Sequence, residues 1–319
     1  MRAWEVEFSD GRPRLRATEM DEPAPAQGEV VVRVRAAGVT PTELLWYPTT
    51  HTSSGAPRLH AVPGHEFAGV VAAVGAGVGG VEVGQEVFGM NDWFADGATA
   101  EFCVTRPEWI APKPSRLSFA ESAATPIGAL TAWQGLFDRA KLQRGETVLI
   151  HGASGGVGVF AVQLAHRHGA RVVATASASA REFLAALGAD RVIDYRGERF
   201  EDDVRDVDVV FDGVGGMTLE RSWSVLRPSG RLVTIAADSE GTTDERIKRA
   251  FFIVELNGGQ LRGIAGMLEA GELRAFVQGE VPMSRADEAY AGTATRSGTR
   301  GKVVVVSVKP SAMKVDSRP

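Results

Sequence analysis

The chain has 319 residues, enough for two domains or for one domain with another inserted into it. A net charge of −5 gives no basic surface for nucleic acid or for an anionic membrane, and a single cysteine, Cys103, excludes an internal disulfide and a multi-cysteine metal cluster. No run approaches the roughly 18 apolar residues that span a bilayer. The first stretch, MRAWEVEFSDG, carries charges and is no secretory h-region, so we expect a cytoplasmic protein.

The first third of the sequence predicts short strands separated by glycine-rich turns. Such dense strand and turn signals are typical of a small barrel or sandwich. The predicted strands cover residues 29–39 (EVVVRVRAAGV), 67–78 (FAGVVAAVGAGV), 86–90 (EVFGM) and 98–105 (ATAEFCVT).

The middle of the chain predicts a different architecture. Residues 118–137 have a helical pattern, with Ser118 as N-cap and Glu121 completing a capping box. Apolar strands and helices then alternate from residue 147 to residue 237, which predicts a doubly wound parallel sheet. The segments 274–283 and 301–308 return to a strand pattern with a short helix between them. We expect them to pair with the first domain and the polar tail after Val308 to be frayed.

A glycine cluster follows the strand TVLIHG and opens a helix over residues 157–168. It is a variant of the G-x-G-x-x-G fingerprint in which Ala153 takes the first glycine position. The chain must turn sharply there, approach a pyrophosphate closely and let helix and strand pack tightly, while the helix N-terminus offers free N–H groups to phosphates. The cluster therefore predicts a dinucleotide site on Ser154, Gly155, Gly156, Val157 and Gly158.

The residues after the second strand of this unit indicate which nucleotide is held. NAD sites usually place an acid about 20 residues beyond the glycines, but the sequence ATASASAR has no acid before Glu182. Ser177 and Arg181 are suited to a 2′-phosphate, so we predict NADPH as the cofactor. The alternative for this segment is structural, because Ser179 and Glu182 have the spacing of a capping box.

The chain resembles the medium-chain dehydrogenase/reductase superfamily, and within it the zinc-independent quinone oxidoreductase branch. The resemblance covers nearly the whole chain and rests on AAGVTPTEL, VPGHEFAGVVAAVG, IGALTAW, GETVLIHGASGGVGVFAVQLA and LGADRVIDY. It implies a GroES-like β-barrel domain interrupted by a Rossmann doubly wound sheet, with the active site between them. The implied boundaries are residues 1–123 for the first part of the catalytic domain, 124–271 for the NADP-binding domain, and 272–319 for the return segment and tail.

The resemblance also implies further cofactor contacts. It adds Tyr195 to the 2′-phosphate region and places Thr131 near the nicotinamide. The positions expected to line the nicotinamide half or the edge of the cleft are Val214, Ala236, Phe252 and Lys302. The resemblance further implies a homodimer, with the segment KRAFFIVEL (residues 248–256) as a strand that pairs across a two-fold axis.

The sequence predicts no catalytic metal. The zinc alcohol dehydrogenases of this superfamily carry a cysteine where this chain has Thr40, although they share the G-H-E of Gly64, His65 and Glu66. Thr40 supplies no thiolate, so we expect His65 to be a hydrogen-bonded barrel residue rather than a ligand. Without a metal to polarise an alcohol or ketone, the favoured substrates are already electrophilic.

Three residues are predicted on the substrate side: Thr40, Tyr47 and Trp93, with Tyr47 as the candidate catalytic donor. Trp93, together with Trp46, is suited to a flat apolar wall, although packing alone also explains such aromatic residues. The predicted function is an NADPH-dependent, zinc-independent reductase of quinones or α,β-unsaturated carbonyls. An enoyl reductase that tailors a polyketide or another secondary metabolite, and an NADPH-binding redox sensor without turnover, are the alternatives.

Overall fold

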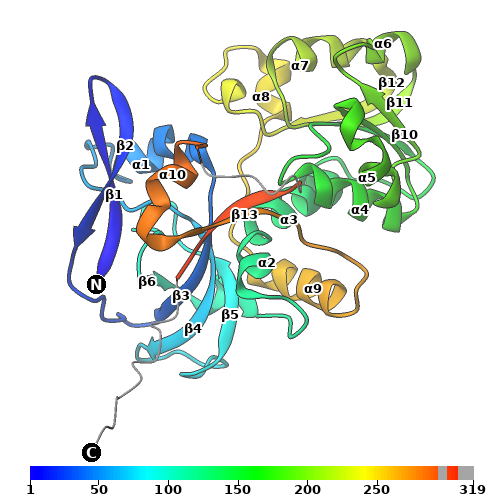
Figure 1. Ribbon diagram of the computed structural model, residues 1–319. Helices are drawn as coiled ribbons and strands as arrows, with labels where there is room; N and C mark the ends of the chain where they lie inside the picture. Colours follow the sequence, from blue (N-terminus) through cyan, green and yellow to red (C-terminus); the bar gives the residue numbers. More distant parts are fainter. Residues whose placement is uncertain (294–299, 308–319) are drawn as a thin grey trace, which may run out of the picture.

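The computed structural model describes residues 1–293 and 300–307, and it separates two sheets into the two halves of the molecule (Figure 1). The tail after Val308 lies outside the described residues. One half contains the early and late strands, and the other contains the alternating strands and helices of the middle of the chain. This arrangement confirms the predicted fold class.

In the described chain, seven strands form a barrel-like sheet that joins both ends of the sequence. Its order is β13-β14-β3-β4-β5-β7, and β6 pairs with β3. Val304 lies opposite Gly38 in an antiparallel pair, so the late strands return to the first sheet as predicted. The strands are β3 (Val30–Gly38), β4 (Glu66–Val74), β5 (Glu86–Met90), β6 (Phe102–Thr105), β7 (Ile110–Pro112), β13 (Val277–Pro282) and β14 (Lys302–Val306).

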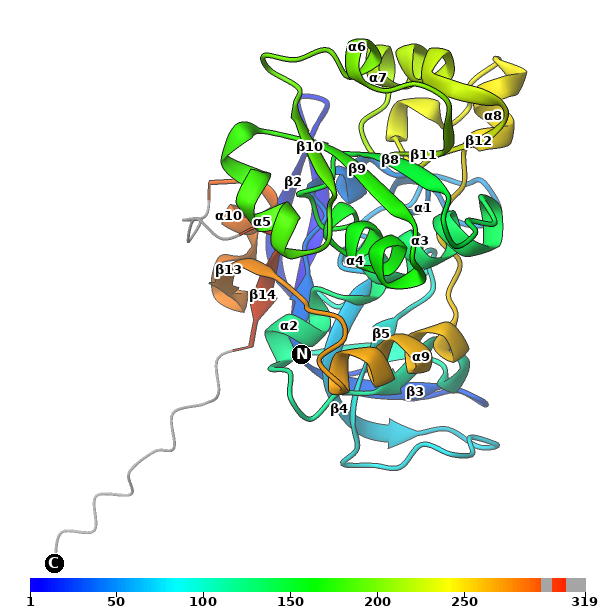
Figure 2. The ribbon, with the colours of Figure 1, turned by 90° about the vertical axis from the view of Figure 1, so that its right-hand side faces the viewer.

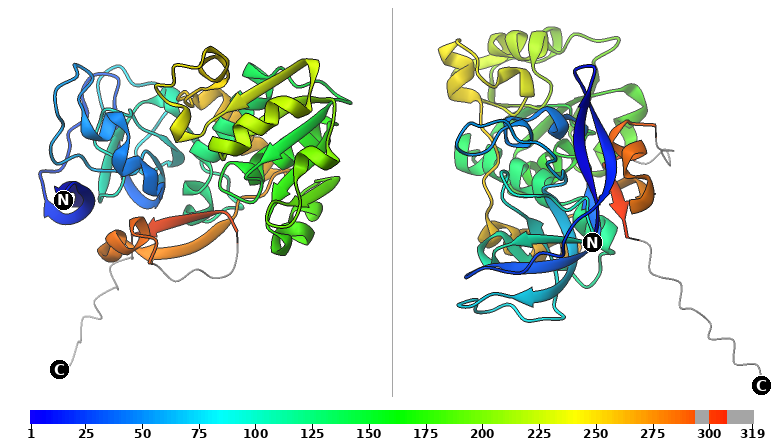
Figure 3. Two further views of the ribbon diagram at one scale, coloured as in Figure 1. Left: turned by 90° about the horizontal axis from the view of Figure 1, so that it is seen from above. Right: turned by 90° about the vertical axis from the view of Figure 1, so that its left-hand side faces the viewer.

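A two-stranded hairpin, which the sequence analysis did not assign, stands along the side of this half (Figure 3, right). It pairs β1 (Arg2–Ser9) with β2 (Arg12–Glu19). The turn residues Asp10 and Gly11 have φ values of 51° and 72°. Two positive φ values suit the twist of a two-residue hairpin loop, for which Asp-Gly is a favoured pair. Two short helices, α1 (Tyr47–Thr50) and α10 (Ala286–Tyr290), also belong to this half.

The second sheet has five parallel strands among the described residues, in the order β10-β9-β8-β11-β12. Its central strands β8 and β11 are almost entirely buried and mostly apolar, because helices cover both faces (Figure 2). The strands are β8 (Thr147–His151), β9 (Arg171–Ala176), β10 (Arg191–Asp194), β11 (Val207–Asp212) and β12 (Leu226–Thr234).

The covering helices lie on opposite sides of the second sheet. One side carries α4 (Gly158–His168) and α5 (Arg181–Ala186). The other side carries α6 (Phe200–Asp203), α7 (Gly216–Ser222) and α8 (Glu245–Ala250). Helix α9 (Gly258–Glu269) packs on β7 and so contributes to the junction between the halves.

The predicted helix over residues 118–137 forms in pieces. Ser118 and Glu121 make the predicted capping box, with Ser118 Oγ accepting the Glu121 N–H at 3.1 Å and the Glu121 carboxylate accepting the Ser118 N–H at 2.9 Å. Pro126 has no N–H to continue the first helix and begins the second. The pieces are α2 (Phe119–Ala123), α3 (Pro126–Trp133) and a π-helical turn (Gln134–Arg139).

The strand predicted over residues 248–256 is wrong at its start, because helix α8 extends to Ala250. Within the single chain, Phe251 makes a β-bridge with Thr234 of β12, and the pairing of the segment across a two-fold axis stays a prediction. The side chain of Asp244 accepts the Arg246 N–H at 2.7 Å and caps this helix. This local cap outweighs the strand pattern at the start of the segment, and the following residues line the cleft described next.

Candidate active site

A cleft of about 920 Å³ is lined by residues from both halves of the molecule. The barrel half contributes the segment after β3 and two aromatic loops, and the second sheet contributes its glycine turn and the ends of β11 and β12. Of the predicted site residues, the cleft is lined by Thr40, Tyr47, Trp93, Thr131, Gly156, Val157, Val214, Ala236, Phe252 and Lys302.

The glycine turn has the geometry that a dinucleotide phosphate needs. Gly152 turns the chain with a φ of 71°, and helix α4 begins without any side-chain cap, which leaves N–H groups at its N-terminus for a ligand. A Cβ on Gly158 would lie 2.5 Å from Ala153 Cα, so only glycine lets the helix pack on the turn. A Cβ on Gly155 would meet one close atom, Gly152 O at 3.3 Å. The turn therefore fits a pyrophosphate on its open side.

Ser154, Gly155 and Gly158 lie in this turn but outside the cleft lining. The hydroxyl of Thr131 also faces its own helix, because it donates to Ile127 O at 2.6 Å. Thr131 thus presents its remaining surface, rather than a free hydroxyl donor, to the cleft.

The loop that carries Val214 is held by a buried carboxylate. Asp212, at the end of β11, accepts the N–H groups of Val214 and Gly215, each at 3.1 Å, and the Thr234 hydroxyl at 2.8 Å. Burial raises the pKa of the Asp212 carboxyl, and these donors oppose that rise. The same network ties the ends of β11 and β12 together below the cleft.

The predicted 2′-phosphate region lies apart from the cleft, at the end of β9. The capping box of Ser179 and Glu182 does not form, because α5 begins at Arg181 with no side-chain cap. Instead, the hydroxyls of Ser177 and Ser179 lie 3.1 Å apart, and Arg300 donates to Ser179 Oγ at 2.7 Å. The serines are therefore free of a helix-capping role.

Arg181 contacts an acid that the sequence analysis missed. Its guanidinium lies 3.2 Å from Glu198 Oε1, and both side chains are well exposed. Tyr195 is exposed, with Arg196 stacked on its ring at 5.5 Å. Arg196 could have been predicted here, because it follows Tyr195 in the sequence. The contacts of Glu198 with Arg181 and of Arg300 with Ser179 join separate segments and had no signal in the sequence.

The substrate side of the cleft has an aromatic wall. The rings of Trp46 and Trp93 meet edge to face at 5.5 Å, and Trp93 also packs on His65 at 5.3 Å. Tyr47 is 48% exposed and stacks on His51 with centroids 4.5 Å apart. A Cβ on Gly55 would lie 3.5 Å from the Tyr47 hydroxyl oxygen, so this phenol reaches the turn that carries Gly55.

A buried ion pair and a buried hydrogen bond between a histidine and a carboxylate lie in the barrel wall beside the cleft. Lys302 pairs with Glu66, whose other carboxylate oxygen accepts the Ile127 N–H at 2.9 Å. Glu43 accepts from His65 Nδ1 at 2.7 Å and from the Gly64 N–H. Burial raises the pKa of the Glu66 carboxyl, and the Lys302 ammonium opposes this effect. Glu43, buried in a short segment that reads as a surface loop, had no sequence signal.

The residues at the zinc-ligand positions do not fit a catalytic zinc ion. His65 is a hydrogen-bonded barrel residue, as the sequence analysis predicted, and its partner Glu43 was not predicted. Glu66 binds the Lys302 ammonium. Lys302 Nζ also lies 3.4 Å from Thr40 Oγ1, so a cationic side chain already occupies the space between Thr40 and Glu66. A divalent ion there would be repelled by this ammonium, and among the described residues at these positions Glu66 would be the one anionic ligand available to it.

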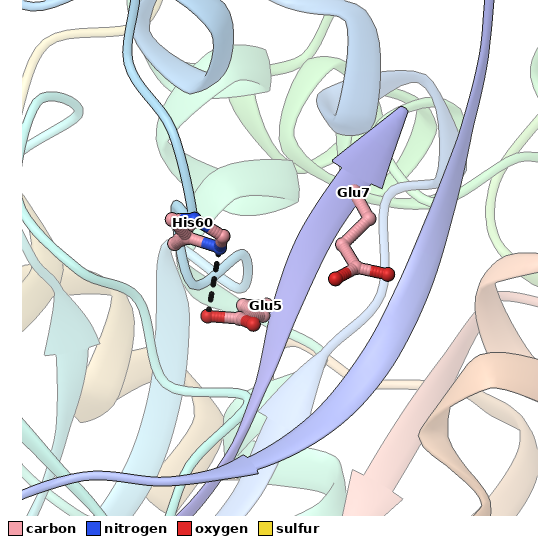
Figure 4. Close-up of side chains that lie close together, drawn as sticks. All are labelled: Glu5, Glu7 and His60. Carbon is pink, nitrogen blue, oxygen red and sulfur yellow. Dashed lines mark ion pairs between the residues drawn. The ribbon is translucent and has the colours of Figure 1, made fainter. Parts of the chain in front are cut away.

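Elsewhere in the described residues, one cluster has ligand types suited to a metal, on the outer hairpin (Figure 4). His60 Nδ1 faces Glu5 at 3.3 Å, and Glu7 lies farther along β1. Arg16 pairs with both Glu5 and Glu7, so the cluster already contains its balancing cation.

Two family models match the chain. "Alcohol dehydrogenase GroES-like domain" matches residues 26–115, and "Zinc-binding dehydrogenase" matches residues 187–305. The latter name describes that family, and the ligand positions above depart from it.

In the described chain, no helix is both long and apolar enough to cross a membrane.

Individual relatives match over almost the whole chain. The 2-methylene-furan-3-one reductase of Solanum lycopersicum is 34% identical and covers 88% of this chain and 72% of its own. The quinone oxidoreductase of Rattus norvegicus is 31% identical, covering 96% and 98%. Among solved structures, the quinone oxidoreductase of Coxiella burnetii has a TM-score of 0.84 at 28% identity, covering 97% and 99%.

The fold and cleft define a nucleotide-dependent oxidoreductase that joins a GroES-like barrel to a Rossmann sheet. The chain belongs to the medium-chain dehydrogenase/reductase superfamily, in its quinone oxidoreductase branch.

Proposed function

We propose that this protein is an NADPH-dependent, zinc-independent reductase that acts on a quinone or an α,β-unsaturated carbonyl. The observation that carries the proposal is the single cleft shared by the glycine turn, the aromatic wall and Lys302. The names of the tomato and rat relatives support the same substrate classes. A cytoplasmic location and a homodimer belong to the same proposal.

The cofactor would lie along the carboxyl ends of the parallel strands β8, β9, β11 and β12, after which the predicted residues follow. The pyrophosphate is assigned to Ser154 to Gly158 at the start of α4, where free N–H groups and the helix dipole favour a negative charge. The 2′-phosphate is assigned to Ser177 and Arg181, with Arg300 as an additional cation, because charged donors bind phosphate oxygens strongly. Val214, Ala236 and Phe252 would enclose the nicotinamide half. When bound, the cofactor supplies the hydride.

The protein's own groups orient the substrate and exclude water. Trp46 and Trp93 offer apolar surface to a planar conjugated ring or enone. Tyr47 is the proposed proton donor, since it lines the substrate side of the cleft and carries a phenol. Its ring is held by His51, which limits the positions that its hydroxyl can take.

The test follows NADPH oxidation by absorbance at 340 nm with a panel of quinones, linear and cyclic enones, and enoyl thioesters. We expect steady turnover with at least one quinone or enone, undiminished by a metal chelator. Turnover restricted to enoyl thioesters would favour the enoyl reductase alternative. NADPH binding without turnover of any acceptor would favour the redox sensor and contradict the proposal.

A further inference from the structure

Lys302 is the one cationic side chain among the described residues that line the cleft. The other charged side chains of this lining, Asp238 and Glu240, are acidic. The Lys302 side chain is only 10% exposed, and its stem runs beside the glycine turn, where a Cβ on Gly156 would lie 3.3 Å from Lys302 Cε. A positive charge is thus held at low exposure in a largely apolar site. There it interacts more strongly with a ligand charge than it would in water.

The ammonium is fixed in place by groups from three elements. Glu66 of β4 binds it, and the Ile127 N–H near the start of α3 binds the other oxygen of the same carboxylate. Gly38 of β3 leaves the space that this carboxylate needs, since a Cβ there would lie 2.6 Å from Glu66 Cδ. The charge is therefore preorganised before any ligand arrives.

The ammonium also has a donor to spare. An ammonium has three N–H groups. In the described part of the chain, the structure gives Lys302 Nζ two acceptors, Glu66 Oε1 and Thr40 Oγ1. Both Thr40 and Lys302 line the cleft, so a third acceptor can come from a bound molecule.

We propose that Lys302 is a catalytic residue whose ammonium binds the substrate oxygen and stabilises the oxyanion formed on reduction. This inference rests on the proposed function. A nicotinamide cofactor held at Ser154 to Gly158 would supply a hydride, with two electrons, to the β-carbon of the enone, and the alkene electrons would move to the carbonyl oxygen as an enolate. A proton, donated by Tyr47 and restored to it from water, then adds at the α-carbon to give the saturated carbonyl compound. For a quinone, the same charge falls on a phenolate oxygen, which protonation converts to the hydroquinone.

The first test needs no turnover. 4-Nitrophenol carries an oxygen that ionises to a phenolate with strong absorbance near 400 nm. With NADP⁺ present, the wild-type protein should lower the pKa of bound 4-nitrophenol and raise its phenolate-to-phenol ratio at least tenfold over that in buffer. This shift should disappear in the double variant K302M/E66Q, which removes the cation and its buried counter-charge together. It should persist in Tyr47→Phe, which retains the cation.

The second test compares catalysis with cofactor binding. We expect K302M/E66Q to lower turnover of an enone by about 10²-fold, the scale of losing one preorganised oxyanion contact. Its NADPH affinity should stay within about threefold of wild type. The matched control is K113M/E86Q, which removes another partly buried lysine–glutamate pair of the barrel, 3.2 Å apart and outside the cleft lining.

The outcomes separate the inference from the proposed function. A wild-type protein that reduces enones but leaves the pKa of bound 4-nitrophenol unchanged overturns the role of Lys302, whether or not the double variant folds. A double variant with intact turnover, or one that loses only NADPH affinity, does the same and assigns Lys302 to the cofactor. A wild-type protein without turnover on any acceptor contradicts the proposed function instead.

Discussion

At the scale of single residues, the 2′-phosphate region joins a predicted cation to an unpredicted acid. Arg181 was expected to meet a phosphate, and in the structure it meets Glu198. The pair is exposed, so its net stabilisation is small and a doubly charged phosphate can displace it. Glu198 then competes with the 2′-phosphate of NADPH for the Arg181 guanidinium. The preference for NADPH over NADH therefore depends on how strongly each of these two anions binds Arg181.

This balance predicts the behaviour of two variants. NADPH should bind at least tenfold more tightly than NADH, since a charge-assisted contact contributes about 1.5–3 kcal/mol. Arg181→Ala should weaken NADPH about tenfold and leave NADH nearly unchanged, whereas Glu198→Gln should strengthen NADPH by a few-fold. Fluorescence titration with both cofactors measures these affinities. Equal affinities of the wild-type protein for NADPH and NADH would contradict the assignment.

A second residue-scale feature is the buried His151 at the end of β8. Its Nδ1 lies 2.9 Å from the Thr175 hydroxyl and its Nε2 lies 3.0 Å from the Ser222 hydroxyl, so the ring ties β8 to β9 and to α7. Burial, with the nearby Arg221 charge, lowers the pKa of His151 to about 3. The folded protein therefore keeps this imidazole neutral.

The lowered pKa predicts a specific loss of stability in acid. The unfolded chain binds the proton from about pH 6.5 downward, and the folded chain only near pH 3, so acid favours unfolding across this interval. The contribution is complete above pH 6.5, and about 2 kcal/mol should be lost between pH 6.5 and pH 5. Urea unfolding at several pH values gives the free energy of unfolding as a function of pH. Below pH 6.5 this free energy should fall less steeply with decreasing pH in His151→Gln than in wild type. The same dependence of the unfolding free energy on pH in both proteins would show that His151 does not titrate in this way.

At the scale of elements, the glycine turn depends on how closely α4 approaches the preceding strand. Gly158 begins the helix with its Cα hydrogen facing Ala153, at a distance that admits no Cβ. Gly263 is also a helical glycine, in α9, but a Cβ there would meet nothing within 4 Å. The two positions separate the effect of close packing from that of helix propensity.

Alanine at these two positions should have opposite effects. Gly158→Ala should destabilise the protein by about 1–3 kcal/mol, because the added methyl group overpacks the turn, and should weaken NADPH at least tenfold. Gly263→Ala should stabilise it by up to about 1 kcal/mol, since alanine favours a helix interior over glycine. Thermal unfolding and NADPH titration check both. If Gly158→Ala changed neither the stability nor the NADPH affinity, the turn would have space for a Cβ at this position, contrary to the structure.

At the scale of the whole molecule, β12 is one of the two edge strands of the second sheet, and β10 is the other. The extended segment after α8 bridges β12 only at Phe251, and Ile253 in that segment is 53% exposed. A sheet edge with apolar neighbours is unfavourable in water unless something covers it. A second copy of the chain is the partner that the family resemblance implies, although helix α8 occupies residues 248–250 at the start of the segment that was expected to pair with it.

This edge predicts the oligomeric state. Light scattering at micromolar concentration should give the mass of two chains, and Ile253→Asp should shift the population toward one chain by placing a charge in the contact. Thr50→Asp, on the opposite half, provides a control that adds the same charge elsewhere. A wild-type monomer would contradict the dimer.

The sequence by itself determined most of the elements and their order, the β1–β2 hairpin excepted, because apolar periodicity, glycine turns and caps act over a few neighbouring residues. The phosphate turn, the Ser118 capping box and the return of β14 to β3 follow from such patterns. The same locality explains the error at residues 248–250, where the Asp244 cap, which lies before the apolar run, extends helix α8 into the predicted strand.

Only the tertiary structure decided which charges meet. Glu66 and Lys302 are 236 residues apart, and the barrel brings them together because β14 returns to pair with β3 beside β4. Glu198 with Arg181, Arg300 with Ser179, and Glu43 with His65 are likewise contacts between separate segments. A charged side chain has no periodic signal for its partner, so its electrostatic environment exists only once the chain has folded.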